Sequence, residues 1–333
     1  MRNRLKPLTS LVSCCLLFLS LPGGHAAGWE TTPCEPVCTA RHEAAMTALN
    51  GKLYLLGGRG VKAVEEYDPA SNGWKQFAKT PMELHHFQAL VVGDRIALVG
   101  AMTGGYPKEP SVENVWWFDP AKDEWSKGPA MPAGRKRGGA GAVLHENRVY
   151  LICGNTNGHW NGFVPWLDVL DLKTGQWTAL PDAPHARDHF QAALVDEKIV
   201  AAGGRCSYAE KNQTFDLTVP EVDVYDPATG KWTTIEEDIP TPRAGCMAVA
   251  RDGKMVVIGG ESVRQPMAHA EVEALSLAKG KWSAWPSLKQ GRHGTGAALI
   301  GNELYIAAGC ANRGGSPELN SVEKIIWPQA ETK

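Results

Sequence analysis

Pairs of short apolar runs recur along the chain. In the stretch that starts at Arg41, the runs "AAMTAL" and "KLYLLGG" are joined by the polar pair "NG". Two β-forming runs joined by Asn-Gly are the signal of a β-hairpin. The pattern occurs six times at a spacing of roughly 50 residues, which is typical of repeat architectures. The copies start near Arg41, Leu84, Lys136, Arg187, Arg243 and Arg292, and each ends in a doublet of small residues.

A second half follows five of the hairpins. It contains a turn rich in Asp, Pro and Gly, and a tryptophan that opens the next strand. These tryptophans are Trp74, Trp125, Trp177, Trp232 and Trp282. A four-stranded sheet that is apolar on both faces cannot bury itself, so copies must pack face to face, and a ring leaves no copy unpaired. The sequence predicts an all-β fold, a six-bladed β-propeller formed by six repeats over residues 41–328 and followed by a short tail, 329–333.

The last repeat lacks one strand. Its third strand is "SVEKIIW", and no turn followed by tryptophan comes after it. The matching piece lies at the other end, where "AGWETTPCEP" with Trp29 resembles "NGWKQFAKTP" with Trp74. We therefore expect residues 27–40 to supply an N-terminal strand that completes blade six and closes the ring.

The repeated pattern resembles the kelch repeat. The shared features are an arginine at the start of the first strand, a glycine doublet after the second, a hydrophobic residue with Asp-Pro, and then a spaced tryptophan. The resemblance covers nearly all of the chain after residue 26 and implies a kelch-type propeller. Kelch propellers include binding modules, sugar mutarotases and the core of a copper oxidase, so the resemblance leaves the function open.

The first 26 residues have the form of a cleaved export signal. A basic start, "MRNRLK", precedes the apolar run "LTSLVSCCLLFLSLP" and the small-residue stretch "GGHAAG". We expect cleavage near Ala26 and a periplasmic or extracellular protein. A lipoprotein signal ending at Cys14 is the alternative. No later segment has the roughly 20 apolar residues that a membrane span needs.

Charge and cysteine content narrow the partners. The net charge of the whole chain is −2, and loss of the basic signal makes it more negative, which argues against nucleic acid. The six cysteines outside the signal are an even number in a compartment where disulfides persist, so disulfides are expected, with Cys34 and Cys38 the nearest pair. These cysteines are Cys34, Cys38, Cys153, Cys206, Cys246 and Cys310.

The starts of the six hairpins mark one end of the central channel. Because the second strand returns to the end where the first began, hairpin starts and doublet loops share one face. At the first three positions of the repeats, the candidate ligand contacts are Arg41, His42, His85, His86, Arg137, Arg187, Asp188, His189, Arg243, Arg292 and His293. The arginines belong to the repeat itself, so a structural role at the blade junctions is the competing interpretation. The histidines are not required by the repeat, although each could simply be packed.

Loops of unequal length add aromatic side chains to this face. We expect Tyr106, Trp160 and Tyr208 at the rim, either as ligand contacts or as anchors for their loops. Aromatic faces beside arginines suit a carboxylated or polyhydroxylated ligand. A metal site formed by His42, His85, His293 and Asp188 is chemically admissible, but it needs residues from distant blades, so we expect no metal and no cofactor.

Two functions follow from this picture. The first is binding, without catalysis, of a carbohydrate, a small anion or a protein on the loop face by a monomeric propeller. The alternative rests on a distant similarity to the exported kelch sialic-acid mutarotases, and it is a mutarotase or epimerase similar to N-acetylneuraminate epimerase. His189 or His86, together with Glu43, Asp188 or Glu261, could supply the proton transfers that such a reaction needs.

Overall fold

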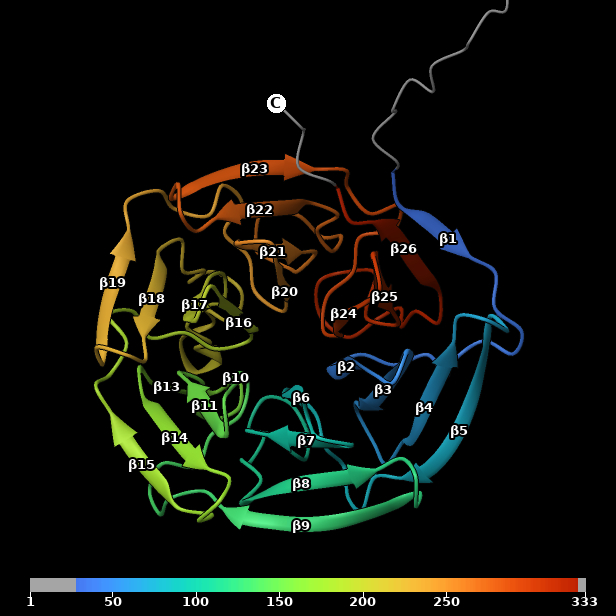
Figure 1. Ribbon diagram of the computed structural model, residues 1–333. Coiled ribbons are helices and arrows are strands. Elements are labelled where there is room, and N and C mark those ends of the chain that lie inside the picture. The colour runs from blue at the N-terminus through green and yellow to red at the C-terminus, as the bar shows by residue number, and fades with distance from the viewer. Residues whose placement is uncertain (1–27, 329–333) are drawn as a thin grey trace, which may run out of the picture.

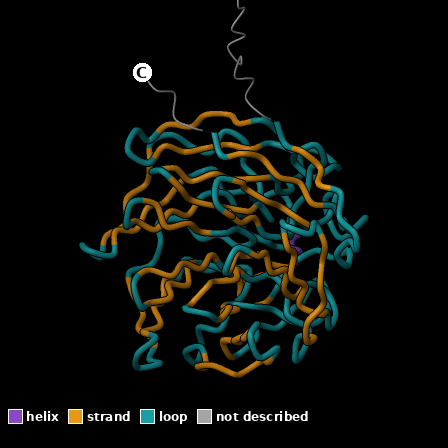
Figure 2. The backbone as a smooth tube through the Cα atoms, turned by 45° about the vertical axis from the view of Figure 1, so that its right-hand side comes forward, coloured by secondary structure: helices purple, strands orange, loops and turns teal. Residues whose placement is uncertain are grey.

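The chain forms a closed ring of six four-stranded antiparallel sheets (Figure 1). A computed structural model describes residues 28–328. The expected export signal and the short tail lie outside these residues. The short motif η1, Ala209–Lys211, is a 3-10 helix, and no helix within residues 28–328 is long and apolar enough to cross a membrane. The remainder is strand and loop (Figure 2).

Within each blade the strands run from the channel outward in chain order, except that β1 is the outermost strand of blade six. Blades one and two are β2 (Ala44–Leu49), β3 (Lys52–Gly57), β4 (Ala63–Asp68) and β5 (Gly73–Lys79), then β6 (Gln88–Val92), β7 (Arg95–Val99), β8 (Asn114–Asp119) and β9 (Glu124–Ala130). Blades three and four are β10 (Gly141–His145), β11 (Arg148–Ile152), β14 (Leu167–Asp171) and β15 (Trp177–Leu180), then β16 (Ala192–Val195), β17 (Lys198–Ala201), β18 (Val222–Asp226) and β19 (Lys231–Ile235). Blade five is β20 (Met247–Arg251), β21 (Lys254–Ile258), β22 (Val272–Ser276) and β23 (Lys281–Trp285), and blade six is β24 (Ala297–Ile300), β25 (Glu303–Ala307), β26 (Val322–Ile326) and β1 (Glu30–Thr32). A loop of blade three adds the short hairpin β12 (Asn155–Asn157) and β13 (Asn161–Phe163).

The ring is closed by the N-terminal strand, as the sequence predicts. Strand β1 pairs antiparallel with β26, with Thr31 opposite Glu323. Trp29, 2% exposed, packs in the apolar cluster between blades five and six. Its indole Nε1 donates to the Pro286 carbonyl at 2.9 Å. The first and last strands of the described chain, β1 and β26, therefore share one sheet (Figure 1).

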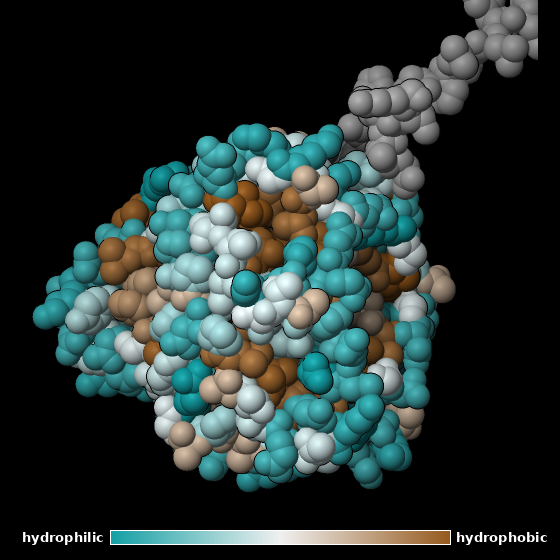
Figure 3. Space-filling model, turned by 60° about the vertical axis from the view of Figure 1, so that its left-hand side comes forward, coloured by the Kyte–Doolittle hydropathy of each residue, from teal (hydrophilic) through white to brown (hydrophobic). Residues whose placement is uncertain are grey.

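Apolar clusters fill the spaces between neighbouring blades. Between blades one and two, Tyr54 and Leu56 pack with Leu98 and Phe118. Burial of such side chains stabilises the fold by about 1.5–3 kcal/mol each. On the face shown in Figure 3, hydrophobic residues form separate patches between hydrophilic ones. All six cysteines of the described chain are free thiols, so the expected disulfides are not found.

The five repeat arginines lie inside the blades, each fully buried and paired with a carboxylate on the third strand of its blade. The pairs are Arg41 with Glu65, Arg137 with Asp168, Arg187 with Asp223, Arg243 with Glu273 and Arg292 with Glu323, at N to O distances of 2.5–2.7 Å. Each guanidinium also donates to backbone carbonyls of its own blade; that of Arg41, for example, bonds Gly57 and Ala63. Because the five guanidinium groups are fully buried inside their blades, they present no free edge to the channel and are not the ligand contacts that the sequence predicts.

Candidate functional site

A closed ring of backbone hydrogen bonds surrounds the channel at the third position of the repeats. We call these six residues the collar: Glu43, His86, Gly139, His189, Gly245 and Gly294. Five of the bonds run from the amide of one collar residue to the carbonyl of the collar residue in the preceding blade, at 2.6–3.1 Å, and the sixth runs from Ala44 N–H to the Gly294 carbonyl at 3.2 Å. The collar therefore links all six blades at one level of the channel.

All six collar residues have left-handed backbone conformations. Three are glycines, whereas Glu43, His86 and His189 adopt φ values of 53–54° with full side chains. Non-glycine residues in this region are uncommon and tend to cluster at functional sites. The glycines also make room, because a Cβ on Gly294 would lie 3.0 Å from the amide nitrogen of Glu43. The collar thus has side chains that can bind or exchange protons at three positions and glycine, without a side chain, at the other three.

The two copies of "HFQA", residues 86–89 and 189–192, supply the side chains that fill the channel below the collar. After each histidine, the phenylalanine packs against a glycine of a neighbouring blade, with Phe87 against Gly57 and Phe190 against Gly141. Gln88 then crosses the channel, donating to the Ala192 carbonyl and accepting from the amides of Ala142 and Ala192. Gln191 makes the corresponding bonds to Thr295 and Ala248. A small cavity of about 40 Å³ lies between the collar and these side chains.

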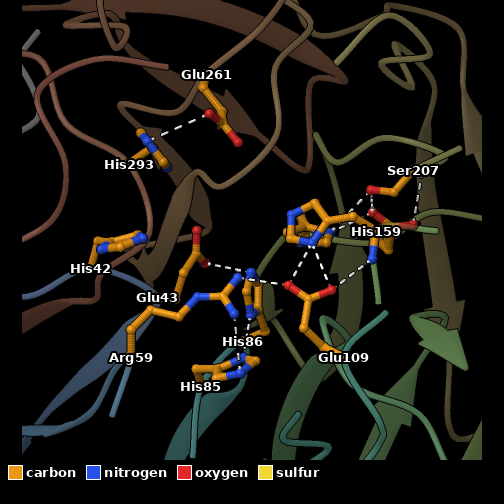
Figure 4. Close-up of polar contacts among 12 residues, drawn as sticks. His42, Glu43, Arg59, His85, His86, Glu109, His159, Ser207, Glu261 and His293 are labelled. Carbon is orange, nitrogen blue, oxygen red and sulfur yellow. Dashed lines mark hydrogen bonds and ion pairs between the residues drawn. The ribbon is translucent and has the colours of Figure 1, made fainter. Parts of the chain in front are cut away.

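Three buried imidazoles meet at the collar, and Figure 4 labels two of them, His86 and His159. His86 and His189 belong to the collar, and His159 reaches it from the loop between β12 and β13. The ring centroids are separated by 4.6 Å for His86 and His189, 4.4 Å for His159 and His189, and 5.1 Å for His86 and His159. One ring nitrogen from each lies within 4.8 Å of the others. We refer to these three residues as the histidine cluster.

Each member of the histidine cluster has its own carboxylate. His189 Nδ1 lies 2.5 Å from Asp188, and His159 Nδ1 lies 2.9 and 3.0 Å from the two oxygens of Glu109. His86 Nε2 lies 2.9 Å from a Glu43 oxygen, while its Nδ1 lies 2.6 Å from His85 Nδ1. Asp188 and Glu109 are fully buried. The carboxylates fix the orientation of the rings.

Further polar groups hold these carboxylates in place. Asp188 accepts hydrogen bonds from the hydroxyl and amide of Ser207 and from the Asn155 side chain. Arg59 donates to Glu109 at 2.7 Å (Figure 4). Arg205 bonds Ser207 and forms an ion pair of 2.6 Å with Glu261, so the network extends from blade four to blade five.

Above the histidine cluster, a cavity of about 440 Å³ opens at the mouth of the channel. We call it the funnel. Its lining includes the carboxylates of Glu43, Glu83 and Glu261 together with His159. Arg59, Tyr106 and Phe215 also line it, so charged, aromatic and hydrogen-bonding groups from sequence-distant loops face one space.

Burial and neighbouring charges shift the pKa values of the site. Burial holds the pKa of His86 well below its ordinary value, and burial with the nearby His189 lowers the pKa of His159. Burial would raise the pKa of Asp188, but His189 and Arg205 bring it down to about 2. His293 is the exception, since Glu261 outweighs burial and raises the pKa of this imidazole to about 9.

The other predicted contacts lie at different distances from the funnel. His42 lines the funnel and forms an ion pair of 2.6 Å with Glu318, whereas His85 lies fully buried behind His86. His293 lies beside Glu261 on the side of the funnel away from Glu109 (Figure 4). Of the predicted rim aromatics, Tyr106 lines the funnel. Trp160 instead stacks under Lys108 and Tyr208 packs on Phe163, so both anchor loops.

Several site residues, among them Arg59, Arg205 and Glu109, are missing from the sequence prediction, which named Glu261 only as a possible partner in proton transfer. Arg59, Arg205 and Glu261 each directly follow the small doublet of their repeat, and the same position in blade three holds Asn155. In five blades, two to six, the residue at this position pairs with the second repeat position, as Arg205 does with Asp188. The aligned position after the doublet is the signal that could have found them. Glu109 lies in a loop without a repeat counterpart and gives no such signal.

Comparison with known proteins bears on this repeat pattern. Sequences described as the KLHDC2/KLHL20/DRC7 Kelch-repeats domain match residues 87–309, more than half of the chain. The chain belongs to the kelch-repeat family. This kelch propeller is similar to a solved structure titled "Structure of YjhT", with a TM-score of 0.71 over 86% of this chain and 95% of that chain. Sequence identity is 17%, so the likeness concerns the fold.

Two relatives show how far the similarity extends. The kelch propeller is 27% identical to Kelch-like protein terF of Aspergillus terreus over 84% of this chain and 64% of that protein. It is 30% identical to Kelch repeat and BTB domain-containing protein 8 of Danio rerio over 47% of this chain and 25% of that protein. The chain thus spans less than two thirds of the length of either relative.

Proposed function

We propose that this kelch propeller binds a polyhydroxylated small molecule, of the carbohydrate class, in the funnel. The observation that supports this most is the lining of the 440 Å³ cavity. Carboxylate, imidazole and guanidinium groups can accept and donate hydrogen bonds to hydroxyls, while Tyr106 and Phe215 offer ring faces to C–H groups. A cavity of this volume is within the range of small-ligand sites.

The charge of the funnel favours a neutral sugar over an anion. The repeat arginines are buried inside the blades, and Arg59 and Arg205 are already paired with Glu109 and Glu261. Glu43 and Glu83 add negative charge to the lining. A carboxylated ligand would face these groups at a cost, because like charges brought together at a binding site are unfavourable.

A second candidate function is acid–base exchange on the bound sugar, as in a mutarotase. Its support is the facing pair His159 and His189, whose rings are 4.4 Å apart and whose Nδ1 atoms are each held by a carboxylate. This arrangement leaves Nε2 of each ring for proton transfer. Ring opening and closure of a sugar requires only such transfers.

The binding proposal is tested by thermal unfolding of residues 27–333 with neutral and acidic mono- and oligosaccharides. A ligand at a hundred times its Kd stabilises the protein by about 2.7 kcal/mol. Tyr106→Ala should abolish this gain without lowering the melting temperature of the free protein, because Tyr106 is 58% exposed. Tyr208→Ala, a loop aromatic outside the funnel, serves as the matched control. Stabilisation by acidic sugars alone would contradict the preference for neutral ligands.

If no sugar stabilises the protein, the small-molecule proposal fails and a protein partner on the loop face becomes the better hypothesis. For the second candidate, the exchange rate between sugar anomers is followed by proton NMR with catalytic amounts of protein. His189→Gln should return this rate to the uncatalysed value. Equal rates with and without the wild-type protein would reject the mutarotase.

Export is part of the proposal. The support is the signal-like sequence of the first 26 residues. Expression of the whole chain in a Gram-negative host, followed by fractionation and N-terminal sequencing, should give a periplasmic protein that begins near Ala27. A cytoplasmic protein with an intact N-terminus would contradict it, and a lipid-modified Cys14 would support the lipoprotein alternative.

A further inference from the structure

We propose that the histidine cluster, His86, His159 and His189, binds a single divalent first-row transition metal ion such as Zn²⁺. The three imidazoles are buried at the centre of the channel, and one ring nitrogen from each lies within 4.8 Å of the others. Three histidines with one further position left open form a common catalytic zinc set. This inference does not rest on the proposed carbohydrate function.

The protonation pattern of the rings is the first argument. Nδ1 of His159 and Nδ1 of His189 face carboxylates, so each donates a proton and leaves a lone pair on Nε2. Donation from a metal-binding histidine to a carboxylate is the usual outer arrangement around zinc, and it fixes both the tautomer and the ring orientation. Two rings are therefore held in the metal-binding form.

The tautomer of His86 follows from its neighbour. His85 Nε2 lies 3.0 Å from the Gly104 carbonyl, which can only accept, and 3.4 Å from Arg59 Nη1, which can only donate. The shorter contact favours donation from His85 to Gly104. The Nδ1 atoms of His85 and His86 lie 2.6 Å apart, so one of them donates a hydrogen bond to the other. A neutral His85 protonated on Nε2 can only accept at Nδ1, and His86 is then the donor. The lone pair of His86 then lies on Nε2, 2.9 Å from a Glu43 oxygen. A lone pair facing a carboxylate is repulsive unless a cation or a proton lies at that point.

An unpartnered nitrogen is the second argument. Nε2 of His189 is buried, and no group among residues 28–328 hydrogen-bonds it, whereas Nε2 of His86 has its contact with Glu43. Leaving a buried polar atom without a partner costs about 1–3 kcal/mol. A metal ion bound there would give Nε2 of His189 the partner that it lacks.

The backbone provides a rigid frame for two of the ligands. His86 and His189 belong to the hydrogen-bonded collar, where both hold left-handed conformations. His159 comes from a loop and is fixed by Glu109, which Arg59 also holds. Tetrahedral zinc at about 2.1 Å from each nitrogen needs nitrogen separations of about 3.4 Å. Small rotations of the rings toward one another would bring the cluster to that spacing.

The position left open by the three histidines faces the funnel. Both His159 and Glu43 line that cavity, so a water or a ligand oxygen could reach the metal from above. The metal set considered in the sequence analysis was His42, His85 and His293 with Asp188. It overlooked His159 as a ligand, because this residue lies outside the aligned hairpin starts.

The test uses residues 27–333 purified without a histidine tag, stripped with a chelator and titrated with Co²⁺. We expect one Co²⁺ per chain with the intense visible absorption of a four- or five-coordinate site, displaced by Zn²⁺. His159→Gln should abolish this absorption, and Glu109→Gln should weaken binding about 10–100-fold. His145→Gln, at the end of β10 away from the collar, should bind like the wild type.

Circular dichroism and melting temperatures establish that each variant is folded. Because Glu109→Gln and His159→Gln change loops outside the collar, at least one folded variant should remain for comparison. Weak pink octahedral absorption alone, or unchanged affinity in the folded loop variants, would overturn the proposal. So would a near-ultraviolet thiolate-to-cobalt band, since that band would assign the metal to a cysteine.

Discussion

Leu84 and Trp116 occupy in blade two the two places that an arginine and a carboxylate occupy in the other five blades. Trp116 lies opposite Leu98 on the neighbouring strand, as Asp168 lies opposite Leu151 in blade three. Both Leu84 and Trp116 belong to the apolar packing between blades one and two. The same two positions are therefore filled by an ion pair in five blades and by apolar side chains in blade two. Because an apolar pair can replace it, the repeat arginine with its carboxylate is a part of the scaffold.

Arg243→Leu should therefore destabilise the fold by about 3–5 kcal/mol, because Glu273 keeps a nearly buried charge without its partner. The double variant Arg243→Leu/Glu273→Leu should regain at least half of that loss, since no uncompensated charge remains. Urea unfolding of both variants measures the difference. Arg148→Leu, at the exposed first residue of β11, should change stability by less than about 0.5 kcal/mol. Equal losses in the single and double variants would contradict the pairing argument.

Gly294→Ala should destabilise the protein more than Gly301→Ala. Both glycines have similar positive φ values, 64° and 57°, so both substitutions carry the same backbone strain of about 1 kcal/mol. A Cβ on Gly294 would also crowd the Glu43 amide, while Gly301 has open space around it. We expect an additional loss of about 1–3 kcal/mol at Gly294. Thermal unfolding of the two variants side by side isolates the crowding in the collar.

Gln88→Leu should cost about 2–5 kcal/mol. The side chain satisfies the amides of Ala142 and Ala192 and the carbonyl of Ala192 inside the channel, and leucine would leave these groups without partners. Gln176→Leu, at an exposed turn, is the matched control. A loss no larger than that of the control would mean that water replaces the amide without penalty.

Stability should fall as pH rises through the alkaline range because of His293. The folded-state pKa of about 9 lies above the usual value near 6.5, so the protonated imidazole stabilises the native state fully below pH 6.5. That contribution, on the order of 3 kcal/mol, is lost as pH rises through about 9. Urea unfolding at pH 6 and pH 10 should show the fall in wild type and a smaller one in His293→Gln. Parallel curves would show that the imidazole does not contribute.

Trp29→Ala should cost about 3–5 kcal/mol, the usual loss for a buried tryptophan. The reason is that Trp29 fixes the N-terminal strand to blades five and six. Val37→Ala, at a side chain that is 51% exposed, should change little. Denaturant unfolding of both variants provides the comparison, and a small effect of Trp29→Ala would mean that strand pairing alone closes the ring.

The fold could be predicted because every repeat contributes the same local signals. Hairpin turns, doublets and tryptophans recur in register, and the missing strand after "SVEKIIW" identified the closing partner. The first-position arginines misled because their side chains turn into the blade, toward carboxylates on the third strand. Alignment places a residue at a position along the chain, but the direction of its side chain depends on what it can pair with.

The candidate site could be predicted only in part from the sequence, for a related reason. His86 and His189 occupy aligned positions, so their meeting in the channel could be predicted. His159 and Glu109 come from loops of different blades, and nothing in the repeat fixes how far those loops reach. Arg205 and Glu261 form an ion pair between blades four and five that requires the ring geometry itself. Contacts between loops depend on the closed ring and not on any local pattern.

The ion pair between His42 and Glu318 joins residues 276 positions apart, one in the first repeat and one in the last. Funnel residues likewise come from the whole length between them, and Gly314 and Gly315 of blade six line the funnel opposite groups of blades one to five. A partly synthesised chain, or one cut before its last repeat, therefore has no funnel at all. Ligand binding in the funnel would therefore require all six blades, so that fragments without the last repeat would not bind.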